Sequence, residues 1–294
     1  MRWEDLMEEK VDMKAEKIKR YSIRTVKIII CICLVLIAVF PLYWLIAMAI
    51  RPMSEMTGKI SLIPQTLTSE QFKALFQDGS FLRAIKNSLF TTLISMVISL
   101  AVGLCASYII SRNRYRLKMK KPLTLWVLIV RILPPVAFTI PLYIMFNRFG
   151  ILNTRIPAVL ACILINIPLI IWFMVSFFED LPEEIEESAM MDGTNEWQMF
   201  TKIVLPLVLP GIAAVSMLSF MYAWNEYTYS VIFVQSPQNY TVPLTLATLN
   251  SDDSLTNFGL VAAGGVISVI PVTLFVIFAQ NYLITGLSSG AVKE

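Results

Sequence analysis

Six apolar runs dominate this chain, and each is long enough to cross the hydrocarbon core of a membrane as a helix, which takes about 20 residues. Inside a bilayer each backbone N–H and C=O needs a partner within the protein, and a helix supplies those partners within one segment. We therefore predict an all-α integral membrane protein with six transmembrane helices, at residues 25–50, 84–110, 123–146, 158–178, 207–234 and 258–284.

Composition agrees with a membrane protein and excludes several other classes. Of the 294 residues, 56% are hydrophobic and 15% are charged, which is too apolar for an ordinary soluble domain. The net charge of +3 is small, and the basic residues lie beside apolar runs, which argues against a nucleic-acid partner. Histidine is absent and the four cysteines lie within apolar runs. We therefore predict no catalytic residue, no metal site and no disulfide framework.

Basic residues predict the orientation of the spans. Six Lys or Arg residues lie at 112–121 and eight at 2–27, and the positive-inside rule places both segments in the cytoplasm. The loops at 51–83, 147–157 and 235–257 are then external. We divide the chain into a cytoplasmic segment (1–24), a six-span domain (25–285) and a cytoplasmic C-terminal tail (286–294).

A polar stretch at 180–206, between the fourth and fifth apolar runs, carries the signals of two short helices. We predict that Asp180 caps the first helix and that Gly193 ends it in a left-handed conformation. Thr194 is expected to cap the second helix, and Pro206 to end it. The loop is therefore predicted to be folded.

Within this stretch the sequence ESAMMDG is followed, nine residues after its Gly, by IVLP. This spacing, in a loop between two spans, resembles the EAA loop of binding-protein-dependent ABC importer permeases, with Ser in place of the first Ala. In that family the loop is a cytoplasmic coupling helix docked in a cleft of the ATPase subunit. The alternative, a solvated acidic loop, does not account for the Gly and Leu-Pro spacing. The resemblance assigns ATPase coupling to Glu183, Glu187, Ser188, Ala189, Asp192, Gly193, Ile203, Leu205 and Pro206.

Three further segments resemble the carbohydrate, maltose-type (MalG-like) branch of the same family: WNEY at 224–227, NSL at 87–89 and GLSSGAVK at 286–293. The resemblance covers nearly the whole chain from residue 25 onward. It implies a MetI-like permease core, in which the last five of six helices form the part shared across the family.

The resemblance also implies partners and a location. The family works in the bacterial cytoplasmic (inner) membrane, among lipid, as a multi-pass subunit with both termini in the cytoplasm. Its partners are a second permease, here expected in a heterodimer, two ATPase subunits and an extracytoplasmic sugar-binding protein. Because this sequence has no GxxxxGK[ST] motif, we expect no cofactor on this chain, and ATP and Mg in the ATPase subunits.

Polar and aromatic side chains interrupt the fourth and fifth apolar runs. A carboxylate within a span is costly and indicates a functional site by default. Asn and Tyr hydrogen-bond to hydroxyl groups, and aromatic faces stack on sugar rings. The alternative is that these groups bond neighbouring helices to one another. We predict a substrate pathway, with Arg131 as the partner of Glu226, lined by Asn166, Tyr222, Trp224, Asn225, Glu226 and Tyr227.

The function predicted from the sequence is that of a non-catalytic transmembrane subunit of an ATP-driven importer for a sugar or oligosaccharide. An ion- or proton-coupled secondary transporter, using Glu226 and Arg131 as a relay, is the alternative; it needs no ATPase subunit and leaves the hairpin unexplained. A membrane scaffold or receptor predicts no solute flux.

Overall fold

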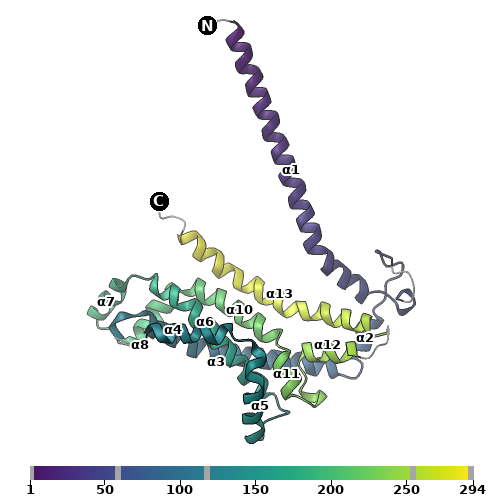
Figure 1. The fold of residues 1–294 in the computed structure, drawn as a ribbon, viewed down its shortest axis with the longest axis vertical. Helices are drawn as coiled ribbons and strands as arrows, with labels where there is room; N and C mark the ends of the chain where they lie inside the picture. The colour runs from purple at the N-terminus through teal and green to yellow at the C-terminus, as the bar shows by residue number, and fades with distance from the viewer. Residues whose placement is uncertain (1–2, 57–60, 116–119, 252–255, 291–294) are drawn as a thin grey trace.

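The computed structural model describes the backbone of residues 3–56, 61–115, 120–251 and 256–290, and the side chains within 23–56, 61–115, 120–249, 258–280 and 282. In these ranges all regular structure is helical (Figure 1), which confirms the predicted all-α class. Some predictions concern residues outside this description. They are those for the first cytoplasmic residues, for parts of the first and last external loops and of the basic loop, and for the end of the tail: 1–2, 57–60, 116–119, 252–255 and 291–294.

In the described part of the chain, four helices are long and apolar enough to cross a membrane by themselves: α1 (Trp3–Ala49), α3 (Ser80–Ser111), α6 (Ile156–Glu179) and α13 (Thr256–Gly290). Two further candidates are bent pairs. In the first, α4 (Lys120–Ile132) meets the segment Pro135–Arg148 at 102°. In the second, Glu196–Leu207 meets Leu209–Phe233 at 80°. Counted as one span each, the bent pairs give the six spans predicted.

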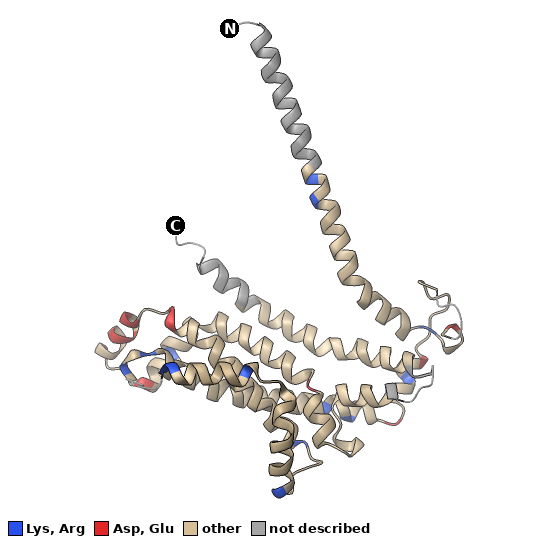
Figure 2. Cartoon of the chain, viewed as in Figure 1, with Lys and Arg blue, Asp and Glu red and all other residues tan. Residues whose placement is uncertain are grey.

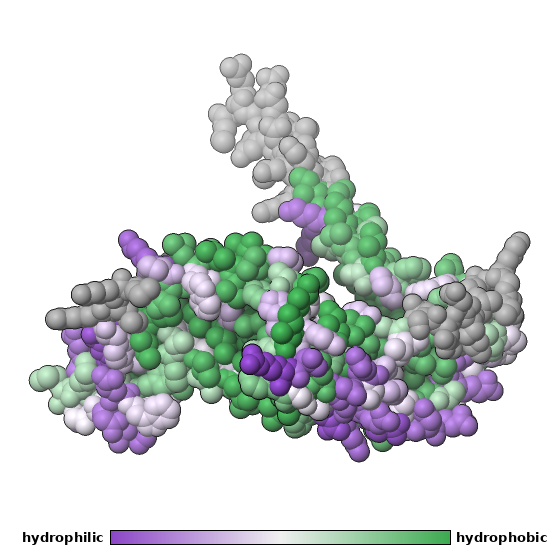
Figure 3. Space-filling view, turned by 60° about the horizontal axis from the view of Figure 1, so that its bottom comes forward, coloured by the Kyte–Doolittle hydropathy of each residue, from purple (hydrophilic) through white to green (hydrophobic). Residues whose placement is uncertain are grey.

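Hydrophobic residues cover the middle of the face shown in Figure 3, while hydrophilic residues gather at its left end and lower right. This distribution fits a protein that crosses a bilayer, because lipid tails solvate apolar side chains and water solvates the polar ends.

Prolines set both bends. Pro134 is extended (φ −64°, ψ 138°) and separates α4 from the short 3-10 helix Pro135–Phe138 and α5 (Thr139–Arg148), so the third span is sharply bent at this point. The expectation that Pro206 ends the hairpin helix is wrong, because the chain stays helical through α9 (Leu205–Leu207). The bend falls at Val208, since Pro210 has no N–H to continue the helix and its ring crowds the carbonyl four residues earlier.

The centre of the fold is the contact of α3 with α6, against which α10 (Leu209–Trp224) also packs (Figure 1). A Cβ atom added to Gly103 would lie 2.6 Å from Cγ2 of Ile170, so the two backbones approach more closely there than a larger residue allows. Many of the other residues that α3 buries are small or polar, beside larger groups such as Phe81 and Tyr108; the small or polar ones include Asn87, Ser88, Thr91, Thr92, Ser95, Ser99 and Ser107. This face lets two long helices lie close together inside the membrane.

Helix α1 runs away from the other helices and meets them only near its C-terminal end (Figure 1). None of its most apolar window is buried within the chain. Near the junction, Arg51 is fully buried, lies over the ring of Trp44 at 5.7 Å and donates to the carbonyl of Ser61 at 2.7 Å. The apolar part of α1, Ile23–Ala49, therefore presents most of its surface to lipid or to another chain.

The segments predicted to be external are ordered by side-chain hydrogen bonds. Helix α2 (Glu70–Phe76) begins after Ser69, whose side chain makes no capping bond. Glu55 accepts hydrogen bonds from the Thr66 hydroxyl and from the backbone N–H of Gln65 and of Thr66. These bonds lower the pKa of Glu55 below its usual value, and the bond from the Thr66 hydroxyl has the largest effect. The carboxylate thus holds the loop after α1 in place.

Asn153 joins two loops that lie far apart in the sequence. Its φ is 59°, and its Oδ1 accepts from the N–H of Gln235 at 3.0 Å and of Ser236 at 2.7 Å. Its Nδ2 donates to the Ser236 hydroxyl at 2.7 Å. The segment it holds leads from α11 (Thr228–Phe233) through the 3-10 helix Pro237–Asn239 to α12 (Val242–Ser251). The loop after the fifth span is therefore fixed rather than free.

Replacing Asn153 with Gly keeps a residue that tolerates positive φ but removes these three side-chain bonds. We expect amide hydrogen exchange at Gln235 and Ser236 to accelerate about 10- to 100-fold, since each bond contributes about 0.5–1.5 kcal/mol. The control is Asn153→Asp, which keeps the acceptor oxygen and is expected to retain most of the protection. Unchanged exchange in the Gly variant would show that the loop is held by other contacts.

Candidate functional site

The polar hairpin turns where the sequence predicts. Its first helix is α7 (Glu183–Met191), and Gly193, two residues beyond the end of that helix, has a φ of +83°. The N–H of Gly193 donates to Met190 O at 3.0 Å, and the N–H of Thr194 donates to Ala189 O at 3.1 Å. This pair of bonds is the Schellman motif, and it requires a left-handed residue at the position of Gly193. The Thr194 hydroxyl adds a bond to the same Ala189 carbonyl at 2.6 Å.

The two predicted caps are wrong. Asp180 does not cap α7, because it is the C-terminal cap residue of α6. Its N–H still donates to the Ser176 carbonyl at 3.0 Å. Thr194 does not cap α8 (Glu196–Met199), because its hydroxyl is turned back to α7. The cap is Asn195, which accepts from the Gln198 N–H at 2.8 Å while its own N–H donates to the Gln198 side chain at 3.3 Å.

After α8 the chain forms one turn of π-helix at Phe200–Val204 before α9. Inserted turns of this kind occur often at functional sites. Here the turn lies between the hairpin and the bend at Val208, so it joins the surface of the hairpin to the fifth span.

The outer surface of the hairpin combines carboxylates with apolar side chains. Ile185, Met190 and Trp197 are exposed, and Met191 is 89% exposed. Exposed apolar groups gathered on one short segment are typical of a protein docking surface. The predicted coupling residues are distributed over this hairpin: exposed Glu187, Ser188, Asp192, Gly193 and Pro206, half-buried Glu183, Ile203 and Leu205, and buried Ala189.

A carboxylate that the sequence analysis did not single out lies beneath α7. Glu186 is 3% exposed. Arg112 Nε donates to its Oε1 at 2.7 Å, and Arg112 Nη2 lies 2.6 Å from the same oxygen, outside hydrogen-bond geometry. Arg114 Nη1 lies 3.1 Å from Oε2, and the Tyr108 hydroxyl donates to Oε2 at 2.8 Å. Both carboxylate oxygens are thus compensated inside the protein, as a buried charge requires. We call Tyr108, Arg112, Arg114 and Glu186 the anchor cluster.

The anchor cluster ties α7 to two membrane-spanning helices. Arg112 directly follows α3, and its Nη1 donates to the carbonyl of Phe178 at 2.5 Å and of Leu181 at 3.4 Å, at the end of α6. One guanidinium therefore joins the ends of α3 and α6 to the buried side of the hairpin. The spacing of Glu186 and Ala189, three residues apart and both buried, is the signal that marks the inner face of α7.

Arg114 extends the cluster toward α8. It donates to the hydroxyls of Tyr108 and Tyr115, and the Tyr115 hydroxyl donates to Glu196 at 3.1 Å. Burial alone would lower the pKa of Arg114, but the bond to Tyr115 and the nearby negative charge raise it above its usual value. Figure 2 shows these blue and red segments gathered at the end of the molecule that carries α7 and α8.

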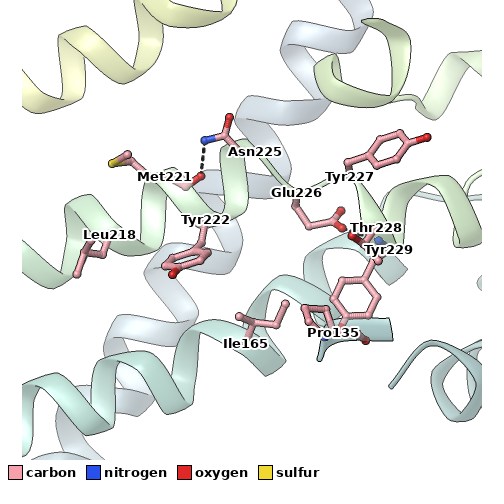
Figure 4. Close-up of a pocket in the computed structure, with 10 residues that line it drawn as sticks. All are labelled: Pro135, Ile165, Leu218, Met221, Tyr222, Asn225, Glu226, Tyr227, Thr228 and Tyr229. Atoms are coloured by element: carbon pink, nitrogen blue, oxygen red, sulfur yellow. Dashed lines mark hydrogen bonds between the residues drawn. The ribbon is translucent and has the colours of Figure 1, made fainter. Parts of the chain in front are cut away.

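A second candidate site lies inside the membrane domain. A cavity of about 440 Å³ is lined by α6 and by the α10–α11 region, and includes Tyr222, Asn225, Glu226 and Tyr227 (Figure 4). A neighbouring cavity of about 210 Å³ lies at the break between α4 and α5. The two share the lining residues Pro135, Ile165, Tyr222 and Tyr229. We call them together the two-lobed cavity.

The structure divides the predicted pathway residues into two groups. Tyr222, Asn225, Glu226 and Tyr227 line the cavity. Trp224 does not; it is 2% exposed, and its Nε1 donates to the Ser268 carbonyl of α13 at 3.1 Å. Asn166 is also buried, with its Nδ2 3.5 Å from the Ser219 carbonyl of α10. Trp224 and Asn166 thus make the helix-to-helix contacts that were the alternative for this set.

The predicted pairing of Arg131 with Glu226 is wrong within the described part of the chain. Glu226 accepts from the Tyr229 N–H at 2.5 Å and from the N–H and hydroxyl of Ser230 at 3.2 and 2.8 Å. The carboxylate therefore caps α11, whose first N–H groups lack partners. Arg131 lies instead over the ring of Trp172 at 5.6 Å and over that of Tyr222 at 5.8 Å.

Known proteins resemble this chain both in sequence, over a region that includes the hairpin, and in fold. Residues 100–289 match the family model described as "Binding-protein-dependent transport system inner membrane component". The trehalose transport system permease protein SugB of Mycobacterium tuberculosis is 30% identical, over 87% of this chain and 93% of that protein. The arabinooligosaccharides transport system permease protein AraQ of Halalkalibacterium halodurans is 32% identical, over 87% of this chain and 92% of that protein.

Among solved structures, one of a bacterial ABC transporter that imports the acidic polysaccharide alginate has a chain with a TM-score of 0.74 and 22% identity, covering 87% of this chain and 95% of that chain. This likeness supports the fold. The family match covers most of the membrane domain, including the whole hairpin, and the relatives align over nearly their full length. On these grounds the chain is an ABC transporter permease and belongs to the family of binding-protein-dependent transport system inner membrane components.

Proposed function

We propose that this chain is one permease subunit of an ATP-driven importer for a sugar or oligosaccharide. The observation that carries the proposal is the construction of the hairpin. Its outer surface is exposed and partly apolar, while its inner side is bound through Glu186 and Arg112 to the ends of α3 and α6. Such a segment is suited to receive a push from another protein and pass it to the membrane helices.

ATP binding and hydrolysis are assigned to two ATPase subunits, which use Mg and dock on the hairpin. The proposed contacts are the predicted coupling residues together with the exposed apolar side chains Ile185, Met190, Met191 and Trp197. This chain has no role in hydrolysis under the proposal. Its part is to convert closure of the ATPase subunits into a change of access on the two sides of the membrane.

A second permease is the proposed neighbour within the membrane, in a heterodimer. Its support is the apolar surface of α1, which the chain itself leaves uncovered. The proposed setting is the bacterial cytoplasmic membrane, with both termini and the hairpin in the cytoplasm and the loop held by Asn153 outside. That outer loop is where an extracytoplasmic sugar-binding protein would dock, since its shape is fixed before any partner arrives.

Sugars are the proposed solutes because the relatives named above transport trehalose and arabinooligosaccharides. The two-lobed cavity supplies groups that suit a polyhydroxylated ring, namely the Tyr222 and Tyr227 side chains and the Asn225 amide. The break between α4 and α5 borders this cavity, and the bend at Val208 follows the hairpin. Motion of the hairpin would thus reach the solute path through helices that are already bent.

The experiment is purification of this chain from its native membrane in mild detergent, with mass spectrometry of the proteins that accompany it. We expect an ATPase subunit and a second multi-span permease, and ATP hydrolysis by the purified complex. Purification of the chain by itself, with solute flux that follows a proton or sodium gradient, would replace the proposal with a secondary transporter.

A further inference from the structure

Arg131 is a charged residue placed deep within a membrane-spanning segment, and no carboxylate among the described side chains pairs with it. It lies in the last turn of α4, eleven residues beyond Lys120 at the start of that helix. At about 1.5 Å per residue this places it roughly 16 Å into the span. An arginine at such depth is costly, and in membrane proteins it faces the protein interior or a cavity that water or solute enters.

Glu226, the carboxylate that the sequence suggests as its partner, does not compensate this charge. Within the described residues Arg131 makes no ion pair, and the oxygens of Glu226 are occupied by the N–H groups of α11 and the Ser230 hydroxyl. The guanidinium carbon lies within cation–π distance of the rings of Trp172 and Tyr222. Among the described residues these rings and not a carboxylate are its neighbours, and its N–H donors can bind a ligand.

Those donors belong to the wall of the two-lobed cavity. Arg131 lines the lobe of about 210 Å³, and Tyr222 and Tyr229 continue from this lobe into the larger one. Tyr222 is 51% exposed, so part of its ring is open to the cavity. A positive, fork-shaped donor therefore lies beside Tyr222. The ring of Tyr222, drawn in Figure 4 among the residues that line the larger lobe, offers an aromatic surface on which a sugar ring can stack.

We propose that Arg131 is a solute-binding residue and that it selects sugars carrying an anionic group, of which a hexuronate carboxylate is the simplest case. The carboxylate accepts two N–H bonds from the guanidinium while the sugar ring lies on Tyr222. A neutral sugar offers only hydroxyl groups to the same donors and leaves the charge of Arg131 uncompensated. The inference rests on the proposed function and gives the class of solute for that same cavity.

The test uses the purified complex in lipid nanodiscs at pH 7, without the binding protein, so that selection by the membrane domain is measured directly. The probes are methyl glycosides of glucuronate, galacturonate and mannuronate, each paired with the neutral glycoside of the same ring. Dissociation constants are obtained from ligand-observed NMR titrations. We expect at least one acidic probe to bind about 10-fold or more tightly than its neutral counterpart, the size typical of hydrogen bonds to a charged group.

Two variants and one control assign the preference. Arg131→Gln is expected to bring the acidic probe to the affinity of the neutral one, while Arg131→Lys keeps part of the preference because the point charge remains. The control is Arg148→Gln, which removes an exposed arginine at the end of α5 and leaves the preference unchanged. Equal binding of acidic and neutral probes by the wild-type complex, or a preference kept in Arg131→Gln, overturns the inference. The inference is also overturned if a carboxylate of the second permease forms an ion pair with Arg131.

Failure of the inference is distinguishable from failure of the proposed function. Absence of an ATPase subunit from the purified complex defeats the importer role before any sugar is added. Equal binding of the two probe classes by a complex that hydrolyses ATP defeats only the assignment to anionic sugars.

Discussion

Replacing Glu186 with Ala is expected to reduce ATP-driven uptake to background while the membrane helices remain folded. The substitution leaves the guanidinium of Arg112, whose side chain is 2% exposed, without its carboxylate. Removing one member of a buried ion pair costs about 3–5 kcal/mol. Because α7 loses its bonds to Tyr108, Arg112 and Arg114 together, we expect the hairpin to detach from the ends of α3 and α6. Uptake and ATP hydrolysis in proteoliposomes are the measurements.

The matched control is Glu184→Ala, the same substitution two residues earlier on the exposed side of α7, which is expected to leave the hairpin attached. Limited proteolysis follows attachment directly, since a released hairpin is cleaved between α7 and α8. A double-mutant cycle adds a sharper test. Glu186→Met combined with Arg112→Met should be less harmful than the sum of the two single changes, because the pair is removed without stranding either charge. Strict additivity would mean that the two residues do not act through each other.

Much of the architecture could be predicted from apolar runs, because the bilayer permits few structures for a segment of that length. The positions of the bends could be predicted less well. Pro134 and Pro206 carry the same chemical signal, yet the helix breaks at the first and continues through the second. Pro206 lies near the end of the continuous helical run Glu196–Leu207 and directly after the π-helical turn Phe200–Val204, whose hydrogen-bond pattern differs from that of an α-helix. Whether the helix breaks at a proline or continues through it depends on the helical turns on either side of that proline.

The anchor cluster could not be predicted from spacing alone. Arg112 and Arg114 were interpreted as topology signals, and the adjacent Glu187, which is exposed, matched the family pattern. Burial of Glu186 depends on α3 and α6 ending at the same level, and this is a property of the folded bundle. The Arg131–Glu226 pairing failed for a similar reason. Opposite charge was the only argument for it, and the N–H groups of α11 compete for the same carboxylate oxygens.

Replacing Gly193 with Val is expected to separate ATP hydrolysis from uptake, with hydrolysis retained and transport largely lost. Gly193 has φ +83°, and a Cβ atom placed there would meet no atom within 4 Å. The obstacle is therefore the backbone conformation and not space. A left-handed conformation costs an ordinary residue roughly 1–2 kcal/mol, and a β-branched residue resists it further. We expect the turn between α7 and α8 to open, so that the surface offered to the ATPase subunits changes shape.

Two controls separate the turn from general damage. Gly193→Asn introduces a side chain that tolerates positive φ, so we expect coupling to be largely kept. Gly150→Val places the same strain at another glycine with positive φ (+67°) and open space, in the loop after α5. We expect that variant to keep the ratio of uptake to hydrolysis, because α5 and its loop lie away from α7 and α8 (Figure 1). If Gly193→Val transports normally, the Schellman turn is not what holds the coupling surface in shape, and the anchor cluster beneath α7 is then sufficient by itself.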